Sequence, residues 1–316
     1  MNILKWNRKI KKIETEKNKI DFVYTYVDSL DQKWKKKWKK TFPNENINSV
    51  RYVNYDEIYF SLKTLEKYGK NICNNIYIFT DNQKLNDNKL SRWLLKKIKY
   101  VFHSDIIPKK FLPTFNSITI ESFIHLIPKL TENFIYMNDD VFLGNELTNN
   151  FLYKNNILNI LVFINNKKKY KYNKNKPWEH YYINADLLFK KKTGIISNIN
   201  PTHTIYLMNK KVCYITWVMF KNELLNSITN KRESKNINFW YLTYLIGLYL
   251  GYYTYKVPNL KESYLMYCEK IGNKNTKKRL LTEVKTLFKN RPVIFCFNNI
   301  TKLCSSIWKY IQLNYI

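Results

Sequence analysis

Two adjacent acids, Asp139 and Asp140, follow an apolar and aromatic run in the segment FIYMNDDVF, residues 134–142. The run predicts a buried strand, and in the turn just after a strand both carboxylates can point at one ligand. Carboxylate oxygens, together with water and phosphate oxygens, are the ligands that Mg²⁺ or Mn²⁺ prefers. An Asp-rich turn without any ligand is the structural alternative, and the dipeptide alone does not separate the two.

Other predicted strands in the first half of the chain also end in polar side chains. Apolar, β-branched and aromatic runs predict strands at 20–28, 75–81, 98–105 and 133–140. Ligands bind beyond the carboxyl ends of the strands of a parallel sheet. One Asp after a strand indicates only a turn, but four polar strand ends at one edge indicate a site. The strand ends are Asp28, Asp81, His103 with Asp105, and Asp139 with Asp140.

A helix is predicted for NSITIESFIHLIPKL, residues 116–130, with Asn116 or Ser117 as its cap. Glu121 and His125 are i, i+4 on this helix, so they can pair with each other. Alternatively, Glu121 points into the cleft at the strand ends. The predicted buried stripe is Ile120, Phe123, Ile124 and Ile127.

His203 and three arginines are further candidates for chemistry. His203 lies in a Pro-bearing loop, NPTHTIY, where a histidine is usually just exposed, but imidazole is also suited to taking a proton near neutral pH. Arginine is scarce, so Arg51, Arg232 and Arg291 are candidates for binding a diphosphate; a surface salt bridge is the commoner use.

The alternation of strands and helices predicts an α/β fold, Rossmann-like, with a mostly parallel sheet flanked by helices and a mainly helical C-terminal half. We expect a basic N-terminal arm at 1–19 and an α/β core at 20–164. Residues 165–180, rich in Lys and Asn, are expected to be a linker or insertion, and residues 181–316 to complete the active site.

The formal net charge of +30, from 54 Lys and Arg against 24 Asp and Glu, favours an anionic partner. It can also reflect a compositional bias toward Lys and Asn. The five cysteines are widely spaced without a C-x-x-C pair, which predicts buried free thiols in a reducing compartment.

The N-terminal segment has no apolar region typical of a secretory signal, so a cytoplasmic location is expected. About 20 uncharged residues from Asn236 have the length of a membrane span. Their many tyrosines favour a buried or interfacial helix, and whether residues 237–255 touch a membrane is left open.

Four groups of segments together resemble the Stealth family of hexose-1-phosphate transferases. IDFVYTYVDSLDQKW (20–34) resembles its first block, with Tyr26 in place of Trp and Ser29-Leu30 in place of Gly-Ser. RYVNYDEIYFSLKTLEKYG (51–69) and LPTFNSITIESFIHLIPKLTENFIYMNDDVFLG (112–144) resemble the long second block, with Ile118 in place of His. His203 with residues 210–242 resembles the third block, and FCFNN (295–299) the fourth, with Asn299 in place of Asp.

This resemblance implies a GT-A-like fold and transfer of a sugar-1-phosphate from a nucleotide-diphosphate sugar, with a UDP-sugar favoured, to a saccharide hydroxyl. It assigns nucleotide-sugar binding to the core at 20–164. It also implies a divalent metal, Mg²⁺ or Mn²⁺, and a role in capsular polysaccharide synthesis with peripheral contact to the anionic inner face of the membrane. The implied metal ligands are Asp139 and Asp140. The implied catalytic residues are His203 as the base, Asp140, Glu121 and Arg232, and the implied donor- or phosphate-binding residues are Asp28, Arg51, Asn116, Ser117 and Asn138.

Three alternatives remain. A metal-dependent glycosyltransferase with the same sheet would move sugar without phosphate. A basic nucleic-acid-binding protein would use the aromatic and basic run QKWKKKWKK, but this leaves the acids at the strand ends unexplained. An inactive family member is possible because of Ile118 and Asn299.

Overall fold

A computed structural model describes residues 19–45, 47, 54–165, 170, 172, 177–268, 274–301 and 304–316. Arg51 lies outside the described residues, as do all but one residue of the predicted arm 1–19 and most of the predicted linker 165–180.

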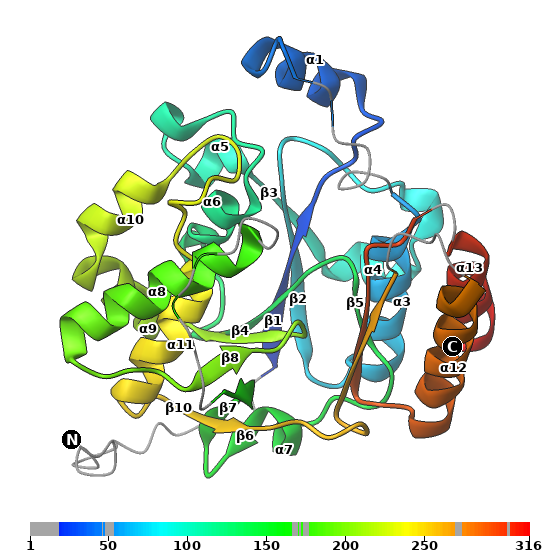
Figure 1. Cartoon of the computed structure of the whole chain (residues 1–316). Coiled ribbons are helices and arrows are strands. Elements are labelled where there is room, and N and C mark those ends of the chain that lie inside the picture. Colours follow the sequence, from blue (N-terminus) through cyan, green and yellow to red (C-terminus); the bar gives the residue numbers. More distant parts are fainter. Residues whose placement is uncertain are drawn as a thin grey trace.

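The central sheet has five strands in the order β3-β2-β1-β4-β9 (Figure 1). Buried aliphatic and aromatic side chains from both faces make it the core of the fold. The first four strands run parallel, and β9 pairs with β4 in the antiparallel direction. The predicted mostly parallel α/β sheet is therefore confirmed. The bounds are β1 (Ile20–Tyr26), β2 (Cys73–Thr80), β3 (Ile98–Phe102), β4 (Asn133–Met137) and β9 (Tyr206–Asn209).

Two smaller sheets are completed by strands from the C-terminal half. In one, β10 (Tyr253–Lys256) pairs with β7 (Ile157–Ile164), which also pairs with β6 (Tyr153–Lys154) and β8 (Ile199–Pro201). In the other, β12 (Ile294–Asn298) lies between β11 (Ser263–Tyr267) and β5 (Val141–Leu143). The C-terminal half thus contributes strands to all three sheets as well as its helices.

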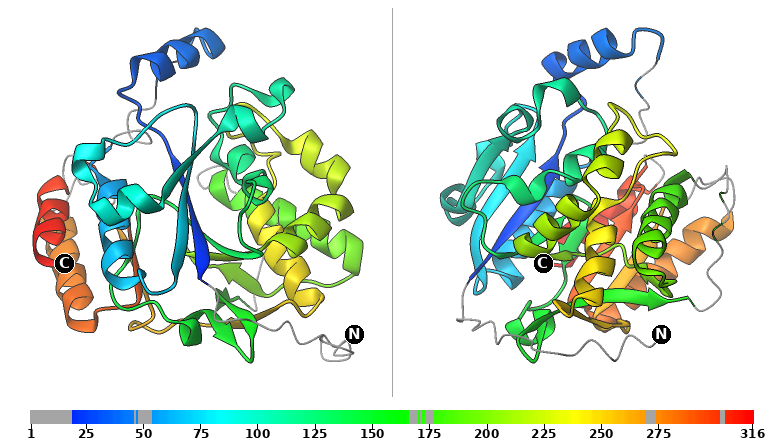
Figure 2. Two further views of the ribbon diagram at one scale, coloured as in Figure 1. Left: turned by 180° about the vertical axis from the view of Figure 1, so that it is seen from behind. Right: turned by 90° about the vertical axis from the view of Figure 1, so that its left-hand side faces the viewer.

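The helices of the C-terminal half lie on two sides of the molecule (Figures 1 and 2). One group is α8 (Pro177–Thr193), α9 (Lys210–Met219), α10 (Lys221–Ser227) and α11 (Phe239–Tyr249), and the opposite side carries α12 (Lys274–Asn290) and α13 (Ser305–Asn314). In the first half, the helical spacing of Ile58, Leu62 and Leu65 and the Gly69 that follows predict a helix that stops at Gly69, and α3 (Glu57–Tyr68) does so. The remaining helices are α1 (Gln32–Thr41), α4 (Arg92–Lys97), α5 (His103–Ile106), α6 (Ser117–Glu121) and α7 (Asn149–Leu152), with 3₁₀ turns at Asp87–Lys89, Lys109–Phe111 and Ile124–Leu126.

The predicted single helix over 116–130 is wrong, because α6 ends at Glu121 and a 3₁₀ turn follows. The amide of Ser122 is shared between the carbonyls of Ile118 and Thr119, and its hydroxyl also donates to the Ile118 carbonyl. Such side-chain bonding competes with the regular helical ladder, and Pro128 disfavours helical backbone at the residue before it. Glu121 and His125 are therefore not paired on one helix.

The predicted strand at 98–105 is too long, because β3 ends at Phe102 and α5 begins at His103. The carboxylate of Asp105 accepts a hydrogen bond of 2.9 Å from the Phe102 amide, so it caps this helix. His103 is buried, with its ring 4.8 Å from that of Phe79. Neither side chain faces a site.

The apolar stretch after Asn236 forms the core helix α11, most of whose residues are buried. This outcome agrees with the buried-helix alternative. Among the described residues, we find no helix both long and apolar enough to cross a membrane.

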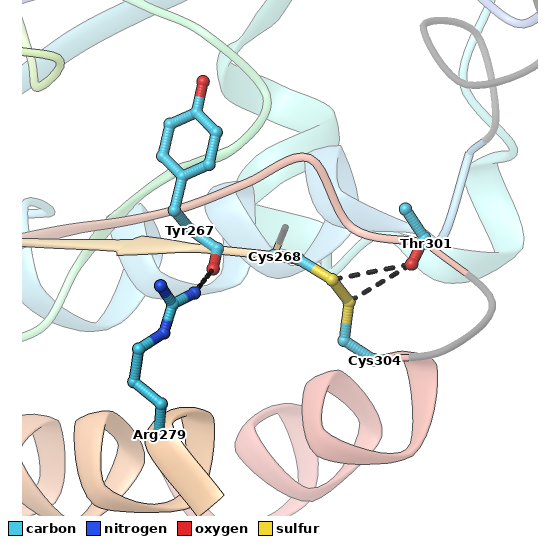
Figure 3. Close-up of a disulfide and its surroundings, with 5 residues drawn as sticks. All are labelled: Tyr267, Cys268, Arg279, Thr301 and Cys304. Atoms are coloured by element: carbon cyan, nitrogen blue, oxygen red, sulfur yellow. Dashed lines mark hydrogen bonds between the residues drawn. A yellow bond between two sulfur atoms is a disulfide. The ribbon is translucent and has the colours of Figure 1, made fainter. Parts of the chain in front are cut away.

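The prediction of free thiols is wrong for two of the five cysteines. Cys268, just after β11, and Cys304, just before α13, form a disulfide with a Cα–Cα distance of 6.6 Å (Figure 3). The hydroxyl of Thr301 lies 3.5 and 3.4 Å from their sulfur atoms. The two positions are 36 residues apart, so only the packing of α13 against the β11–β12 sheet reveals the pair. Cys73, Cys213 and Cys296 are free and buried.

The basic and aromatic run QKWKKKWKK, which the nucleic-acid alternative would use, lies in α1. On α1, Trp34 and Trp38 are buried against Phe115, with ring centroids 5.4 and 4.9 Å from its ring. The lysines of α1 remain at the surface, but the indoles are not a platform on which bases could stack.

Candidate active site

Three segments far apart in the sequence meet at the carboxyl end of β4. Asp140 Oδ2 lies 3.2 Å from His203 Nε2, and the side-chain amide nitrogen of Asn298 lies 2.9 Å from that carboxylate oxygen. The same amide nitrogen is 3.0 Å from His203 Nε2. The carboxylate, imidazole and amide therefore form one hydrogen-bonded group.

Strand register explains why these side chains meet. Val141, which directly follows Asp140, pairs with Cys296 in the antiparallel β5–β12 ladder, and the Phe297 amide donates to the Asp140 carbonyl at 3.2 Å. On the other side, β9 pairs antiparallel with β4, with Tyr206 opposite Tyr136. The loop that enters β9 carries His203 and so ends beside the tip of β4.

His203 is held at both of its ring nitrogens. Nδ1 lies 3.1 Å from the Tyr206 hydroxyl, while Nε2 faces Asp140. Burial on its own would lower the pKa of His203, but the adjacent Asp140 carboxylate outweighs it, so the pKa is raised above its ordinary value. This arrangement stabilises the imidazolium and makes His203 a better proton acceptor.

Asp139 and Glu57 complete an acidic cluster around Asp140. Burial, with the charges of Asp140 and Glu57, raises the pKa of Asp139 to about 8. Burial also raises the pKa of Glu57 to about 7; hydrogen bonds from the backbone oppose this, and the Asp140 charge adds to it. Asp140 Oδ1 is buried and has no hydrogen-bond partner among the described residues. Closely spaced carboxylates with an unused buried oxygen fit a hard divalent cation, which would relieve their mutual repulsion.

A second polar group surrounds Glu121. Its carboxylate accepts hydrogen bonds of 3.1 Å from the Tyr136 hydroxyl and from Trp240 Nε1. Burial raises the pKa of Glu121 to about 7, although the nearby Arg232 guanidinium opposes the shift. Arg232 in turn donates from Nε to the Ser117 hydroxyl at 3.1 Å, at the first residue of α6.

An aromatic wall joins the two polar groups. The rings of Tyr136 and Tyr206 stack with centroids 5.4 Å apart, and the Tyr206 ring lies 4.0 Å from that of Trp240. Because these rings bond to Glu121 on one side and His203 on the other, the two groups flank one surface. The fold thus brings together five of the predicted site residues, Asp140, His203, Glu121, Arg232 and Ser117.

Asn116 and Asn138 lie next to the site in supporting positions. Asn116 is fully buried, and its amide donates to groups of Thr229, Lys231 and Asn236. It therefore fixes the loop that carries Arg232. Asn138 Oδ1 accepts a hydrogen bond of 2.6 Å from the Tyr136 hydroxyl.

Asp28 lies at the tip of β1, next to β4 in the sheet. Its carboxylate accepts a hydrogen bond of 2.9 Å from the Leu30 amide, so it also shapes the turn that follows β1. Both Asp28 and Asp139 help to raise the pKa of Tyr26, after the larger effect of burial, which places these carboxylates around one phenol. Arg51 lies outside the described residues.

The sequence did not indicate four residues that interact with the predicted site residues, through hydrogen bonds or through charge. Asn298 and Glu57 lie inside segments that resemble family blocks, but nothing in those segments says that they reach Asp140. Tyr206 and Trp240 read as ordinary core aromatics until the sheet register is known.

Comparisons with known proteins agree on one family. The model for Stealth protein CR2, conserved region 2, matches residues 51–160. The capsular polysaccharide phosphotransferase cps12A of Actinobacillus pleuropneumoniae is 32% identical, over 94% of this chain and 82% of the relative. The capsular polysaccharide phosphotransferase fcs1 of Haemophilus influenzae is 31% identical, over 89% of this chain and 78% of the relative.

Solved structures with a related arrangement include the galactosyltransferase LgtC, with a TM-score of 0.39, 9% identity, and coverage of 93% of this chain and 95% of that chain. The bifunctional glycosyltransferase WbbM has a TM-score of 0.43 and 13% identity, over 95% of this chain and 50% of that chain.

Proposed function

Because the chain belongs to the Stealth family, with capsular polysaccharide phosphotransferases as its relatives, we propose that it transfers a hexose-1-phosphate in the synthesis of a capsular or cell-surface polysaccharide. The donor is a nucleotide-diphosphate sugar, and the acceptor is a saccharide hydroxyl. The bond between the two phosphates of the donor breaks, nucleoside monophosphate leaves, and the acceptor oxygen becomes part of a phosphodiester.

The observation that carries this proposal is the meeting of Asp140, His203 and Asn298. Phosphoryl transfer needs positioned charges and a proton acceptor more than covalent catalysis. A base paired with a carboxylate, beside a cluster of acids and within electrostatic reach of Glu121, supplies these needs at one strand edge.

We assign the acceptor proton to His203. Nδ1, the ring nitrogen that does not face Asp140, takes the proton from the attacking hydroxyl, and the Asp140 carboxylate beside Nε2 stabilises the imidazolium that forms. Before the acceptor arrives, the Tyr206 hydroxyl contacts Nδ1 and keeps the ring oriented. Arg232 binds phosphate oxygens from the Ser117 side of the aromatic wall, and Glu121 keeps this wall in place through Tyr136 and Trp240.

The proposed metal ligands are the carboxylates of Asp139 and Asp140, with Glu57 next to them. The raised pKa values of Asp139 and Glu57 and the buried Asp140 oxygen favour a cation at this point. When bound, Mg²⁺ or Mn²⁺ would supply charge neutralisation for the diphosphate.

The proposed partners follow from the same chemistry. A UDP-sugar is the favoured donor, and a glycan the acceptor. The net charge of +30 favours anionic partners and is consistent with a cytoplasmic protein at the inner face of an anionic membrane. Nucleic acid is not favoured, because Trp34 and Trp38, the tryptophans of the basic run, are buried.

The test is a screen of sugar nucleotides with Mg²⁺ or Mn²⁺ that scores release of nucleoside monophosphate. A phosphodiester signal in the phosphorus-31 spectrum of the product supports the proposal. Release of nucleoside diphosphate instead assigns the protein to the conventional glycosyltransferases. Salt-sensitive DNA binding without turnover of any sugar nucleotide would favour the nucleic-acid alternative.

A further inference from the structure

One chemical group beside the site is unused in the proposed mechanism, the thiol of Cys296. It lies on β12, opposite Val141 in the β5–β12 ladder, and therefore next to the tip of β4. Its sulfur, an Asp140 carboxylate oxygen and a His203 ring nitrogen all lie within 4.8 Å of one another. Oxygen, nitrogen and sulfur ligands at this spacing are not what Mg²⁺ selects, because Mg²⁺ prefers oxygen ligands.

The spacing fits a small tetrahedral ion. With metal–nitrogen and metal–oxygen bonds of about 2.0 Å, two ligands at tetrahedral angles are about 3.3 Å apart. The distance between His203 Nε2 and Asp140 Oδ2 is 3.2 Å. The two side chains thus need little movement to share one ion.

The solvent access of two of the side chains and an unpartnered Asp140 oxygen also support an ion at this position. Cys296 is 1% exposed, whereas the side chains of His203 and Asp140 are 29% and 20% exposed, so an ion can enter from their side and meet the thiol beneath. The second Asp140 oxygen, Oδ1, which could also face the proposed hard cation, is buried and has no hydrogen-bond partner within the part of the chain that the structure describes. Buried polar atoms in proteins nearly always have a partner, and an ion would provide one.

We propose that Asp140, His203 and Cys296 form a three-ligand site for a thiophilic divalent cation such as Zn²⁺, and that filling this site inhibits the enzyme. Binding exchanges the thiol proton, which leaves to solvent, for a metal–sulfur bond, and no atom changes its oxidation state. Three protein ligands leave a fourth position for water. Inhibition follows because the ion occupies the His203 nitrogen and the Asp140 carboxylate; this part of the inference rests on the proposed function.

The binding part is tested on the full chain, without donor or acceptor, by titration with Co²⁺ as a spectroscopic substitute for Zn²⁺. A sulfur-to-cobalt charge-transfer band in the near ultraviolet is expected, and Zn²⁺ should remove it by competition. Cys296→Ser should lose the band, while the matched control Cys213→Ser, at another buried free thiol, should keep it. A wild-type protein without the band, or a band that persists in Cys296→Ser, overturns the proposal.

A second measurement covers the case in which Cys296→Ser folds poorly. Zn²⁺ should raise the thermal unfolding midpoint of the wild type, because a ligand that binds only the folded state stabilises it. In His203→Ala this shift should be lost at the same Zn²⁺ concentration. Equal shifts in both proteins contradict the site.

The inhibitory part is tested separately by turnover with excess Mg²⁺. Zn²⁺ should inhibit the wild type at a concentration at least about tenfold lower than it inhibits Cys296→Ser, each normalised to its own rate without Zn²⁺. If the protein turns over no sugar nucleotide, the proposed function fails while the cobalt spectrum still decides the metal site. A cobalt band together with Zn²⁺-insensitive turnover would overturn only the inhibition.

Discussion

The two halves of the central sheet edge differ, although all four parallel strands are followed by polar or acidic residues. At the tips of β1 and β4, the carboxylates of Asp28 and Asp139 both lie near the Tyr26 phenol. Asp140, also at the tip of β4, hydrogen bonds to His203 and Asn298. At the tips of β2 and β3, the acids have local partners. Asp81 accepts a hydrogen bond of 2.8 Å from Lys37, and Asp105 caps α5.

The difference arises from what the rest of the chain brings to each half. The strand β9 runs beside β4, and β5, which follows β4 in the chain, pairs with β12. The loop that enters β9 and the end of β12 bring His203 and Asn298 to the tip of β4. At the β2–β3 half, α1 supplies Lys37, which pairs with Asp81. An acid at a strand end becomes part of the candidate site when distant segments bring polar side chains such as His203 and Asn298 to it. Otherwise a nearby residue pairs with it, as Lys37 does with Asp81.

The largest expected effect comes from the β4 tip. Asp140→Asn keeps the size of the side chain but removes a proposed metal ligand and the charge beside the His203 ring. We expect turnover to fall by about 10³-fold. The thermal unfolding midpoint should stay the same or rise, because the substitution removes repulsion between Asp140 and the acids Asp139 and Glu57. Full turnover in this variant would remove Asp140 from the site.

His203→Gln should have the next largest effect. The amide can still bond to Asp140, but it cannot accept the proton of the acceptor, so kcat should fall by about 10²-fold while the KM for the donor changes little. Tyr206→Phe, which removes only the hydrogen bond to Nδ1, should be affected less than His203→Gln. A rise in KM with unchanged kcat would instead mark His203 as a donor-binding residue.

These variants also show how far sequence reasoning reached. The mostly parallel sheet and α3 with its end at Gly69 were predictable, because they depend on local periodicity and caps. The contact between Asp140 and His203 was not, since it depends on the antiparallel register of β9 against β4 over a separation of 63 residues. The break after Glu121 was missed because it depends on the hydrogen bonds of Ser122, which periodicity does not show.

A smaller effect, on stability, is expected at the β3 tip. Burial lowers the pKa of His103 to about 4, while an unfolded histidine titrates near its ordinary value. Between pH of about 6.5 and 4, the unfolded chain binds a proton at this histidine and the folded protein does not. The free energy of unfolding should therefore decrease as pH falls through this range. The slope is at most about 1.4 kcal/mol for each pH unit.

The measurement is urea unfolding of His103→Leu and wild type at several pH values across this range. The free energy of unfolding should change less with pH in the variant than in the wild type, whatever the variant's absolute stability. His125, whose pKa burial also lowers to about 4, should contribute in the same direction, so the double variant with His125→Leu should be flatter again. Parallel curves for all three proteins would mean that these histidines titrate in the folded protein as they do in the unfolded chain.

The smallest effect is expected at the β2 tip, and it tests the comparison most directly. Asp81→Asn removes the same charge as Asp140→Asn from the same edge of the same sheet. Its partner Lys37 is 44% exposed, and such surface pairs contribute little, so the free energy of unfolding should change by less than about 1 kcal/mol. Turnover should stay within about twofold of wild type, because Asp81 bonds to Lys37 and to none of the site residues described above. A loss of turnover similar to that of Asp140→Asn would show that both halves of the edge serve one site, and would mean that the Lys37 contact gives way when donor binds.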